Sequence, residues 1–391
     1  MANTRPDGPD SSGGESRPRR RPRYSGTHPK RFDHRYKELD PAAHPEIHEH
    51  VREQGRTPAG THVPVLVEEV LAALRPAPGE VVADCTIGYG GHAVEFLRRI
   101  GPTGRLIGLD VDGAQLERTA QRLAPEPNAP VVRLHRSHFA GLGKRLNAEG
   151  LDGYDVILAD LGVSSMQVDD AARGFSYKHD GPLDMRMDDR LVRTAADVLQ
   201  SWSVEDLSAA LRELADEPDH ERIARSIVER RKAEAILRTT PLVRLVLAAK
   251  GLSRRAWRQR ADAQPGDLHP AARTFQALRM IVNDELAGLE QFLRTAPWCL
   301  RAGGRIGVIS FHSGEDRRVR QSFHDGLAAG TYAAISDDAV VPTPRKIAGR
   351  LDRHDRGDPG GLLVVTRAAD NGAIVRTRLA RADGGAQQNS F

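Results

Sequence analysis

The amino-acid sequence predicts an α/β fold with a doubly wound parallel sheet and an inserted all-helical domain. Strand-like and helix-like segments alternate with short connections from about residue 61 to residue 170. Helix signals and loops without a buried strand then fill residues 171–267, and strand character returns near residue 300. Alternation of this kind is typical of parallel sheets, and the break in it indicates an insertion within the sheet domain.

Four strands are expected before the insertion, because four apolar runs are bounded by polar or glycine-containing turns. They are EVVADCT at 80–86, RLIGLDVD at 105–112, PVVRLHR at 130–136 and YDVILAD at 154–160. A glycine turn follows the first run, and apolar residues then recur at helical spacing up to Gly101 and Pro102. Ligands of such sheets bind beyond the carboxyl ends of the strands.

After the insertion, HPAARTFQALRMIVNDELAGLEQFL at 269–293 predicts one long amphipathic helix. Its apolar stripe consists of Phe275, Leu278, Val282, Leu289 and Leu293. LRAGGRIGVISFH at 300–312 predicts a further strand behind a glycine turn. The expected organisation is a disordered basic arm at 1–58, the two parts of the sheet domain at 59–170 and 268–340, the insert at 171–267, and a disordered tail at 341–391.

The composition predicts a cytoplasmic protein. No apolar run approaches the roughly 20 residues that cross a membrane, and the start of the chain lacks the apolar stretch of a secretion signal. The net charge of +4 is small for 391 residues, but Arg and Lys are concentrated at residues 17–37, which suits either a nucleic-acid-binding arm or a solubilising tail. Cys85 and Cys299 are expected to be buried reduced thiols, and no metal site is predicted.

A glycine-rich turn, DCTIGYGGH at 84–92, stands between the first strand and the helix after it. Glycine lets backbone amides approach a ligand closely, and a helix N-terminus favours a negative group. The turn is not the GxGxxG of dinucleotide enzymes, which makes a nicotinamide cofactor less favoured without excluding it. Asp110 ends the second strand, where its carboxylate can accept both hydroxyls of an adenosine ribose. The alternative for Asp110 is a helix N-cap.

Two more positions at this edge carry candidate ligand contacts. Phe139 follows the third strand and could lie against an adenine face, although a ring at this place is often ordinary core. DLGVSSMQVDD at 160–170 follows the fourth strand and groups an acid, hydroxyls and an amide at the expected binding edge. We predict the reaction centre there, and the alternative is a loop of ordinary turn residues.

These motifs, with SFHSGEDR at 310–317, resemble the MraW-like family of ribosomal RNA cytosine-N4 methyltransferases. The resemblance runs from HVPVL at 62–66 through DCTIGYGGH, GLDVD, DLGVSSMQVDDAARGFSYKHDGPLDMRMD and HPAARTFQALRMIVNDEL to Arg317. Several long motifs in one order make it specific. It implies a class I methyltransferase fold with a Rossmann-like sheet and an inserted helical domain. It also implies S-adenosylmethionine as methyl donor and a decoding-region cytidine of 16S ribosomal RNA in the small subunit as substrate.

The resemblance further implies a set of donor contacts. They fall on Gly90, Gly91, His92, Asp110, Phe139, Asp160 and Gln167. Only the resemblance indicates His92 as a donor contact, because the sequence pattern alone predicts a residue in the first turn of a helix with a mild capping role. Two departures stand out: Gly314 replaces a Leu that the family usually has, and the tail from 341 lacks the family's usual last strand.

For the chemistry, Asp160 is the first candidate to accept a proton from the target amine, and Asp184 is the second. Each has an alternative role, because Asp160 could hold the donor and Asp184 could pair with Arg186. The insert is expected to hold the RNA through the cationic segment 221–238 and through Trp257, although a solvated helix face has the same pattern.

Three other functions remain open at this stage. A DNA amino methyltransferase usually carries an acid-Pro-Pro-aromatic motif where this chain has DLGV at 160–163. A ribosome assembly factor would use the donor pocket only for stability. A nicotinamide oxidoreductase would bind NAD instead of S-adenosylmethionine. The sequence leaves the oligomeric state open between monomer and homodimer.

Overall fold

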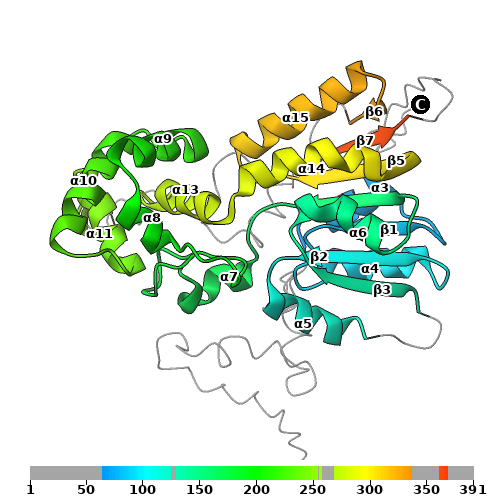
Figure 1. Cartoon of the computed structure of the whole chain (residues 1–391), viewed down its shortest axis with the longest axis horizontal. Helices are drawn as coiled ribbons and strands as arrows, with labels where there is room; N and C mark the ends of the chain where they lie inside the picture. The colour runs from blue at the N-terminus through cyan, green and yellow to red at the C-terminus, as the bar shows by residue number, and fades with distance from the viewer. Residues whose placement is uncertain (1–63, 125–128, 254, 258–267, 337–360, 369–391) are drawn as a thin grey trace, which may run out of the picture.

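The computed structural model describes residues 64–124, 129–253, 255–257, 268–336 and 361–368. The predicted basic arm at 1–58 lies outside these residues, as does most of the predicted tail at 341–391. Within the described part, the chain forms a sheet covered by helices and a separate group of helices beyond one edge of that sheet (Figure 1).

The sheet has seven strands in the order β3-β2-β1-β4-β5-β7-β6 within the described residues. The strands are β1 (Val81–Asp84), β2 (Arg105–Asp110), β3 (Val131–Arg136), β4 (Tyr154–Asp160), β5 (Leu300–Ile309), β6 (Tyr332–Ile335) and β7 (Leu362–Arg367). The first five are parallel, and β7 runs antiparallel to both of its neighbours. The predicted doubly wound sheet is therefore confirmed, with the four early strands and the later one at the expected places.

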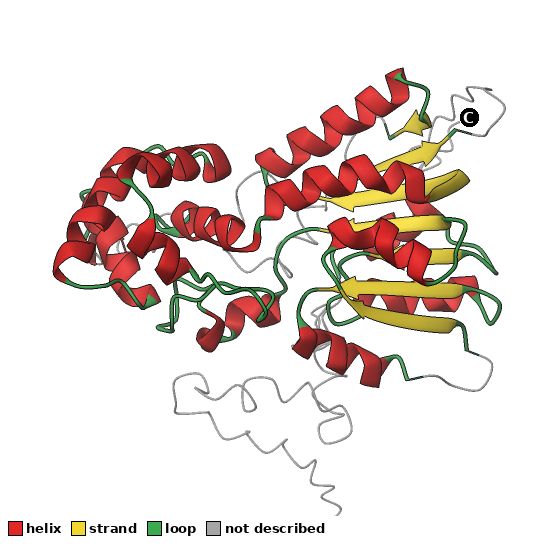
Figure 2. Cartoon of the chain, viewed as in Figure 1, coloured by secondary structure: helices red, strands yellow, loops and turns green. Residues whose placement is uncertain are grey.

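Helices cover both faces of the sheet (Figure 2). One face packs against α3 (Val67–Leu74), α4 (Gly91–Ile100) and α5 (Gly113–Arg122), and the other against α6 (Leu142–Ala148), α14 (Glu285–Cys299) and α15 (Ser313–Ala328). Side chains alternate between the faces along a strand, so Val82 joins one core while Val81 and Ala83 join the other. This double cover explains why the central strands read as continuous apolar runs.

The insert is a helical domain at the carboxyl ends of the parallel strands, to which their arrowheads point in Figure 2. Its helices are α8 (Ala195–Ser201), α9 (Val204–Ala215), α10 (His220–Ala233), α11 (Thr239–Ala249) and α13 (Ala272–Asn283). They enclose their own core, in which Leu211, Ile227 and Val246 are buried. The short helix α7 (Ser165–Asp169) and the single turns η2 (Phe139–Gly141) and η3 (Ala171–Arg173) lie in the connecting loops.

The predicted single helix at 269–293 is wrong, because the chain forms two helices that meet at Asp284. Asp284 has φ 51°, a left-handed conformation that Asp tolerates better than most residues. Phe275 packs in the core of the insert, whereas Leu289 packs in the core of the sheet domain. The boundary between the domains therefore lies at Asp284 and not at 267/268. An apolar stripe that continues through the junction concealed the break.

The predicted tail without structure is wrong for residues 362–367. These residues form β7, which pairs with β5 and buries Leu362, Leu363 and Val365 in the cores. The run LLVVT has the β-branched and apolar character of a strand, but the surrounding Arg, Gly and Asp residues dominated the composition of the tail. Strand β7 thus completes the sheet, although the composition of the tail predicts disorder there.

Three simple expectations concern cysteines, membranes and metals. Cys85 and Cys299 are buried and free, as predicted. None of the helices in the described residues has the length and hydropathy of a membrane span. The same residues contain no group of three His, Cys, Asp or Glu side chains that could hold a metal ion.

Candidate active site

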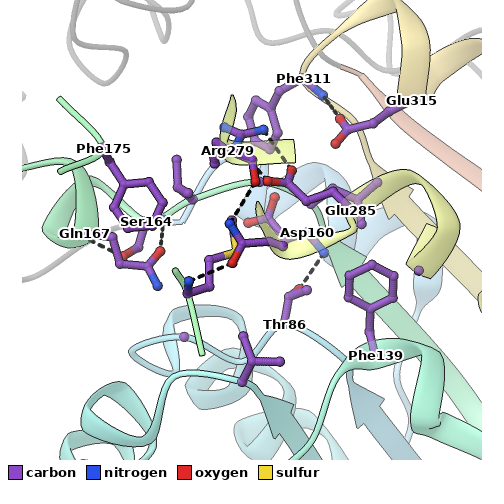
Figure 3. A pocket seen from close by; sticks show the side chains of 18 of the residues that line it. Thr86, Phe139, Asp160, Ser164, Gln167, Phe175, Arg279, Glu285, Phe311 and Glu315 are labelled. Atoms are coloured by element: carbon purple, nitrogen blue, oxygen red, sulfur yellow. Dashed lines mark hydrogen bonds and ion pairs between the residues drawn. The ribbon is translucent and has the colours of Figure 1, made fainter. Parts of the chain in front are cut away.

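A cavity of about 1170 Å³ separates the carboxyl edge of the sheet from the insert. Its walls include the glycine turn after β1, the ends of β2 and β4, the DLGVSSMQ loop, and parts of α13, α14 and α15 (Figure 3). Both domains therefore contribute to one space. The volume exceeds the upper range for a typical small-molecule pocket, so there is room for a cofactor and a second group.

The glycine turn presses closely against a neighbouring helix. Gly88 and Gly90 have φ 49° and 76°, which favour glycine. A Cβ on Gly90 would lie 3.1 Å from Thr119 Cγ2, and the Thr119 hydroxyl donates a hydrogen bond to the Gly88 carbonyl. Gly91 and His92 line the cavity, whereas Gly90 lies behind the cavity wall. The structure thus gives Gly90 a backbone role and leaves its neighbours facing the cavity.

Asp110 has the geometry of a ligand-binding carboxylate at the end of β2. Its two oxygens accept hydrogen bonds from the amides of Gly88 at 2.8 Å and Asp112 at 2.9 Å. The alternative role of helix N-cap belongs instead to Asp112, which accepts from the amides of Ala114 and Gln115. Burial raises the pKa of Asp110 to about 6, although those amide hydrogen bonds act in the opposite direction.

Asp112 is the centre of a network that the sequence analysis missed. Only 3% of this residue is exposed, and its Oδ2 accepts hydrogen bonds from Arg173 Nη1 at 2.8 Å and Gln167 Nε2 at 3.0 Å. The same guanidinium donates through Nη2 to the carbonyls of Arg186 and Met187. Arg173 thereby ties the donor side of the cavity to the loop that enters the insert. Asp112 was hidden because a strand end followed by Asp-x-Asp suits a helix cap equally well.

Gln167 links the DLGVSSMQ loop to Asp112 through hydrogen bonds. It is 6% exposed, its Oε1 accepts from the amide of Ser164 at 3.0 Å, and its Nε2 donates to Asp112. The Ser164 hydroxyl accepts from the Gln167 amide, which completes a capping box for α7 (Figure 3). Gln167 also lines the cavity. It therefore holds the DLGVSSMQ loop against the donor side, and its expected contact with the donor stays a prediction.

Asp160 ends β4 with a side-chain oxygen that has no protein partner. Its amide donates to Thr86 Oγ1 at 2.7 Å, while Oδ1 is buried and accepts no hydrogen bond. Burial is the largest cause that raises the pKa of Asp160 to about 8, and the nearby acids Asp84 and Glu315 contribute to the same shift. Burial likewise raises the pKa of Asp84, which is 2% exposed, to about 7. A buried acceptor without a partner indicates a group that a ligand completes.

His92 stands beside that carboxylate. Its ring is buried, Nε2 lies 3.1 Å from the carbonyl of Val65, and Nδ1 lies 3.9 Å from Asp160 Oδ2. Because the Val65 carbonyl can only accept, Nε2 carries the proton in this contact. His92 thus connects the start of the described chain to the acidic strand end and does not act as a helix cap.

Phe139 lies between the cavity and the core, and its predicted contact with adenine stays a prediction. The ring lines the cavity from η2 and also packs edge-on against Phe292, at 5.8 Å and 86° between the rings. His138 lies against it at 4.1 Å, and a Cβ on Gly288 would collide with the His138 ring. The glycine in α14 therefore lets this aromatic pair lie close to the helix, where Phe139 can offer a face to the cavity.

Asp184, the second catalytic candidate, lies away from the cavity, and its catalytic role stays a prediction. It does not line the cavity, and Arg186 donates to it from Nε at 2.8 Å and from Nη2 at 2.7 Å. Burial alone would raise the pKa of Asp184, but the hydrogen bonds and charge of Arg186 lower it below its usual value. The carboxylate is therefore already neutralised within its loop, which is the alternative role that the sequence left open.

Two buried acids that α14 and α15 contribute to the cavity wall were also missed. Glu315 is 3% exposed and lies 3.2 Å from His312 Nε2, and Glu285 forms a bidentate ion pair with Arg279 at 2.8 and 2.9 Å (Figure 3). The motif SFHSGEDR signalled the first pair, but the helical stripe concealed the second. A Cβ on Gly314 would lie 3.2 Å from His312 Nδ1. The His312 imidazole therefore occupies space beside Gly314, where the family usually has Leu.

The chain was compared with known proteins. Residues 59–334 match the model of the MraW methylase family. The chain belongs to that family. The ribosomal RNA small subunit methyltransferase H 1 of Lachnoclostridium phytofermentans is 40% identical over 326 residues, 83% of this chain and 87% of that protein. The ribosomal RNA small subunit methyltransferase H of Symbiobacterium thermophilum is 47% identical over 263 residues, 67% of this chain and 79% of that protein.

Membership of a methylase family agrees with the sheet order, so the class I methyltransferase fold that the resemblance implied is confirmed. The cofactor of this class is S-adenosylmethionine, and the cavity suits it chemically. Asp110 presents a carboxylate where ribose hydroxyls could donate, Phe139 presents an aromatic face, and Asp160 presents an unpartnered acceptor to a cationic ligand. These three features come from three successive strand ends of one sheet.

Proposed function

We propose that the protein transfers a methyl group from S-adenosylmethionine to the exocyclic N4 of a decoding-region cytidine in 16S ribosomal RNA. The observation that carries this proposal is the unpartnered Oδ1 of Asp160, a buried acceptor that faces a cavity shared by the donor edge and the insert. The names of the relatives support ribosomal RNA of the small subunit as substrate. Action on ribosomal RNA agrees with the expected cytoplasmic location.

The amine of cytosine is a poor nucleophile because its lone pair is conjugated with the ring. The protein must therefore align nitrogen, methyl carbon and sulfur, and such positioning can supply much of the rate. Bound S-adenosylmethionine supplies the electrophilic methyl group. Asp160 accepts a hydrogen bond from the amine, which favours a nitrogen lone pair directed at the methyl carbon, and then takes the proton. Its pKa of about 8 suits a group that exchanges protons near neutral pH.

The target base must leave its stack to reach the cavity, because a base within a duplex cannot approach a buried donor. The insert contributes residues of α13 to the cavity wall, which supports a role for the insert in holding the RNA beside that base. Most cations of α10 have an acidic neighbour one turn away, such as Arg225 with Glu221 and Lys232 with Glu229. These exposed pairs are weak, so phosphates can replace the carboxylates.

One experiment tests donor, substrate and position together. Purified protein is incubated with methyl-labelled S-adenosylmethionine and either small ribosomal subunits, naked ribosomal RNA or duplex DNA, and the label is then mapped. The proposal requires label on N4 of one cytidine of 16S ribosomal RNA. Label in DNA would favour the DNA amino methyltransferase, and binding of NAD in place of S-adenosylmethionine would favour the oxidoreductase. Unchanged ribosomal RNA methylation in a deletion strain would favour the assembly factor.

A further inference from the structure

Phe311 brings an aromatic ring to the reacting edge of the cavity from the strand next to Asp160. Asp160 and Ile309 are paired in the register of β4 and β5, so Phe311 follows two residues beyond the end of the neighbouring strand. The ring is half-buried, packs at its base against the core of the sheet domain, and lines the cavity (Figure 3). It is therefore fixed on one side and available on another.

The backbone of Phe311 is held by buried charge. Its amide donates to Glu315 Oε2 at 3.0 Å, and Glu315 in turn lies beside His312. Burial raises the pKa of Glu315, but His312 and the Phe311 amide outweigh burial and lower it, so this acceptor stays ionised. An ionised acceptor forms a stronger hydrogen bond than a neutral one. The ionised Glu315 carboxylate thus fixes the backbone of Phe311 without any bound ligand.

The ring also rests against the turn that follows Asp160. Gly162 has φ 99°, and a Cβ placed there would meet Phe311 Cδ2 at 3.6 Å. The ring consequently lies beside the DLGV turn, two residues from the carboxylate proposed to accept the amine. DLGV itself contains no aromatic residue. An extruded base is held by stacking on aromatic or apolar side chains, so another element must supply that surface.

Five other Phe and Tyr rings line the cavity and are less suitable. Arg122 lies over the Tyr89 ring, Tyr177 is already stacked on His269, and Phe275 is buried in the core of the insert. Phe139 stands after β3, at the donor side, and packs edge-on against Phe292. Phe175 is 7% exposed and belongs to the core of the insert, with the guanidinium of Arg173 over its ring. Among the described residues, Phe311 combines a half-open ring with a position directly beside the end of β4.

We infer that Phe311 is the stacking surface for the target base, whose exocyclic amine then points toward Asp160. The inference rests on the proposed function, since it requires a base in the cavity. It assigns a substrate-binding role to the first aromatic residue of SFHSGEDR. The ring lies beside the end of β4 and the turn after Asp160, so a base stacked on it would lie near that acid.

The test compares Phe311→Tyr, Phe311→Leu and Phe311→Ala in full-length protein, with the RNA substrate that the wild type methylates. Stacking is sequence-tolerant but needs a π face, so Tyr should keep kcat/KM for RNA within about threefold, while Ala should lower it roughly 10- to 100-fold. Leu fills similar volume without a π face and should fail to restore the rate. The dissociation constant for S-adenosylmethionine should stay within about twofold of wild type in all three variants, since donor contacts lie elsewhere.

A Leu variant with wild-type kcat/KM would overturn the inference, because it would show that packing volume suffices. Thermal unfolding of each variant separates loss of fold from loss of stacking, and Leu against Tyr stays decisive even if the Ala variant unfolds. Trp298→Ala is the matched control, since Trp298 is an aromatic residue of the sheet domain that is 75% exposed and does not line the cavity. If wild type methylates no RNA, the proposed function fails. If wild type is active and all Phe311 variants equal it, only this inference fails.

Discussion

The edge of the sheet and the loop that enters the insert use acidic side chains in opposite ways. At the edge, burial raises the pKa of Asp84, Asp110 and Asp160 to about 7, 6 and 8. In the loop, the Arg190 side chain lowers the pKa of Asp188 by hydrogen bonding, an effect larger than that of burial. The two regions are neighbours around one cavity, yet Asp160 holds a proton near neutral pH whereas Asp184 and Asp188 are ionised.

The difference follows from where each acid finds its positive partner. Asp184 and Asp188 are paired with Arg186 and Arg190, two residues further along the same loop. Among the described residues, Asp84, Asp110 and Asp160 form no ion pair with Arg or Lys, and Asp160 Oδ2 lies 3.9 Å from His92 Nδ1. A sulfonium donor carries the positive charge that the edge lacks. We therefore expect loop acids to shape the fold and edge acids to bind the ligand.

Removing the acceptor at the edge should have the largest effect. Asp160→Asn retains size but cannot take a proton, so kcat should fall by roughly 100-fold or more, the usual contribution of a positioned general base. Asp184→Asn is the matched control, because Asp184 is an acid with an Arg partner outside the cavity. Its kcat should stay within about threefold of wild type. Single-turnover methylation gives the rate of each variant. Equal losses of rate in the two variants would show that the edge acid and the loop acid do not differ in function.

Donor affinity should depend strongly on Asp110. An Asn at this position has one acceptor oxygen in place of two, while the amides of Gly88 and Asp112 each need an acceptor. Loss of charged hydrogen bonds to ribose and backbone should weaken S-adenosylmethionine binding by roughly 10- to 100-fold. Titration calorimetry at constant pH gives the dissociation constant. Unchanged affinity in a folded Asp110→Asn variant would remove the carboxylate from the donor site.

Arg173 should have a smaller effect, because it acts through Asp112. Arg173→Lys keeps a charge but cannot donate at once to Asp112 and to the two carbonyls of the loop. We expect kcat/KM for RNA to fall about tenfold with a smaller change in donor affinity, since one buried charged hydrogen bond is lost. Arg186→Lys is the control on the same loop. If both Lys variants gave the same loss, the Asp112 network would have no special role.

The smallest expected effect concerns the glycine turn. Gly90→Ala and Gly150→Ala both place a Cβ at positive φ, 76° and 61°, but of the two only Gly90 has neighbours, Thr119 and Leu123, within 4 Å. The left-handed conformation should cost each variant about 1 kcal/mol of unfolding free energy. The contact at Gly90 should add about 1 kcal/mol more. Denaturant unfolding compares the two, and equal losses would show that the turn is not packed as described.

The sequence predicted the sheet well because its signals are local. A buried strand such as YDVILAD is recognisable from its own residues, and Asp110 and Asp160 follow from strand ends that must share one edge. The site beyond those ends depended on long-range contacts. Glu285 was invisible because its helix reads as one amphipathic stretch, although a single left-handed residue, Asp284, moves half of it to another domain.

The tail shows the limit of composition as evidence. Residues 362–367 are few, and they pair with two earlier strands, of which β5 lies more than 50 residues away, so no pattern within the segment predicts the pairing. Asp184 shows that a high density of charged residues in a loop does not by itself indicate a catalytic role. A loop rich in Arg and Asp suggested chemistry, but its acids are neutralised by Arg residues of the same loop, which only the side-chain geometry reveals.

At the sheet edge, Asp160 holds a proton near neutral pH until a cationic donor replaces it. For carboxyls whose pKa is raised above the unfolded value, protonation favours the fold, so stability should fall as pH rises from about 4 to about 8, and donor affinity should rise toward pH 8.

The number of protons released on donor binding measures directly whether Asp160 holds such a proton. Binding of S-adenosylmethionine is measured by calorimetry at pH 7 in buffers of different ionisation enthalpy, for wild type and for Asp160→Asn. The donor's own titration is common to both proteins and cancels in the comparison. We predict that wild type releases more protons than the variant, because the bound cation lowers the pKa of Asp160 from about 8. Equal proton release by the two proteins would contradict the account.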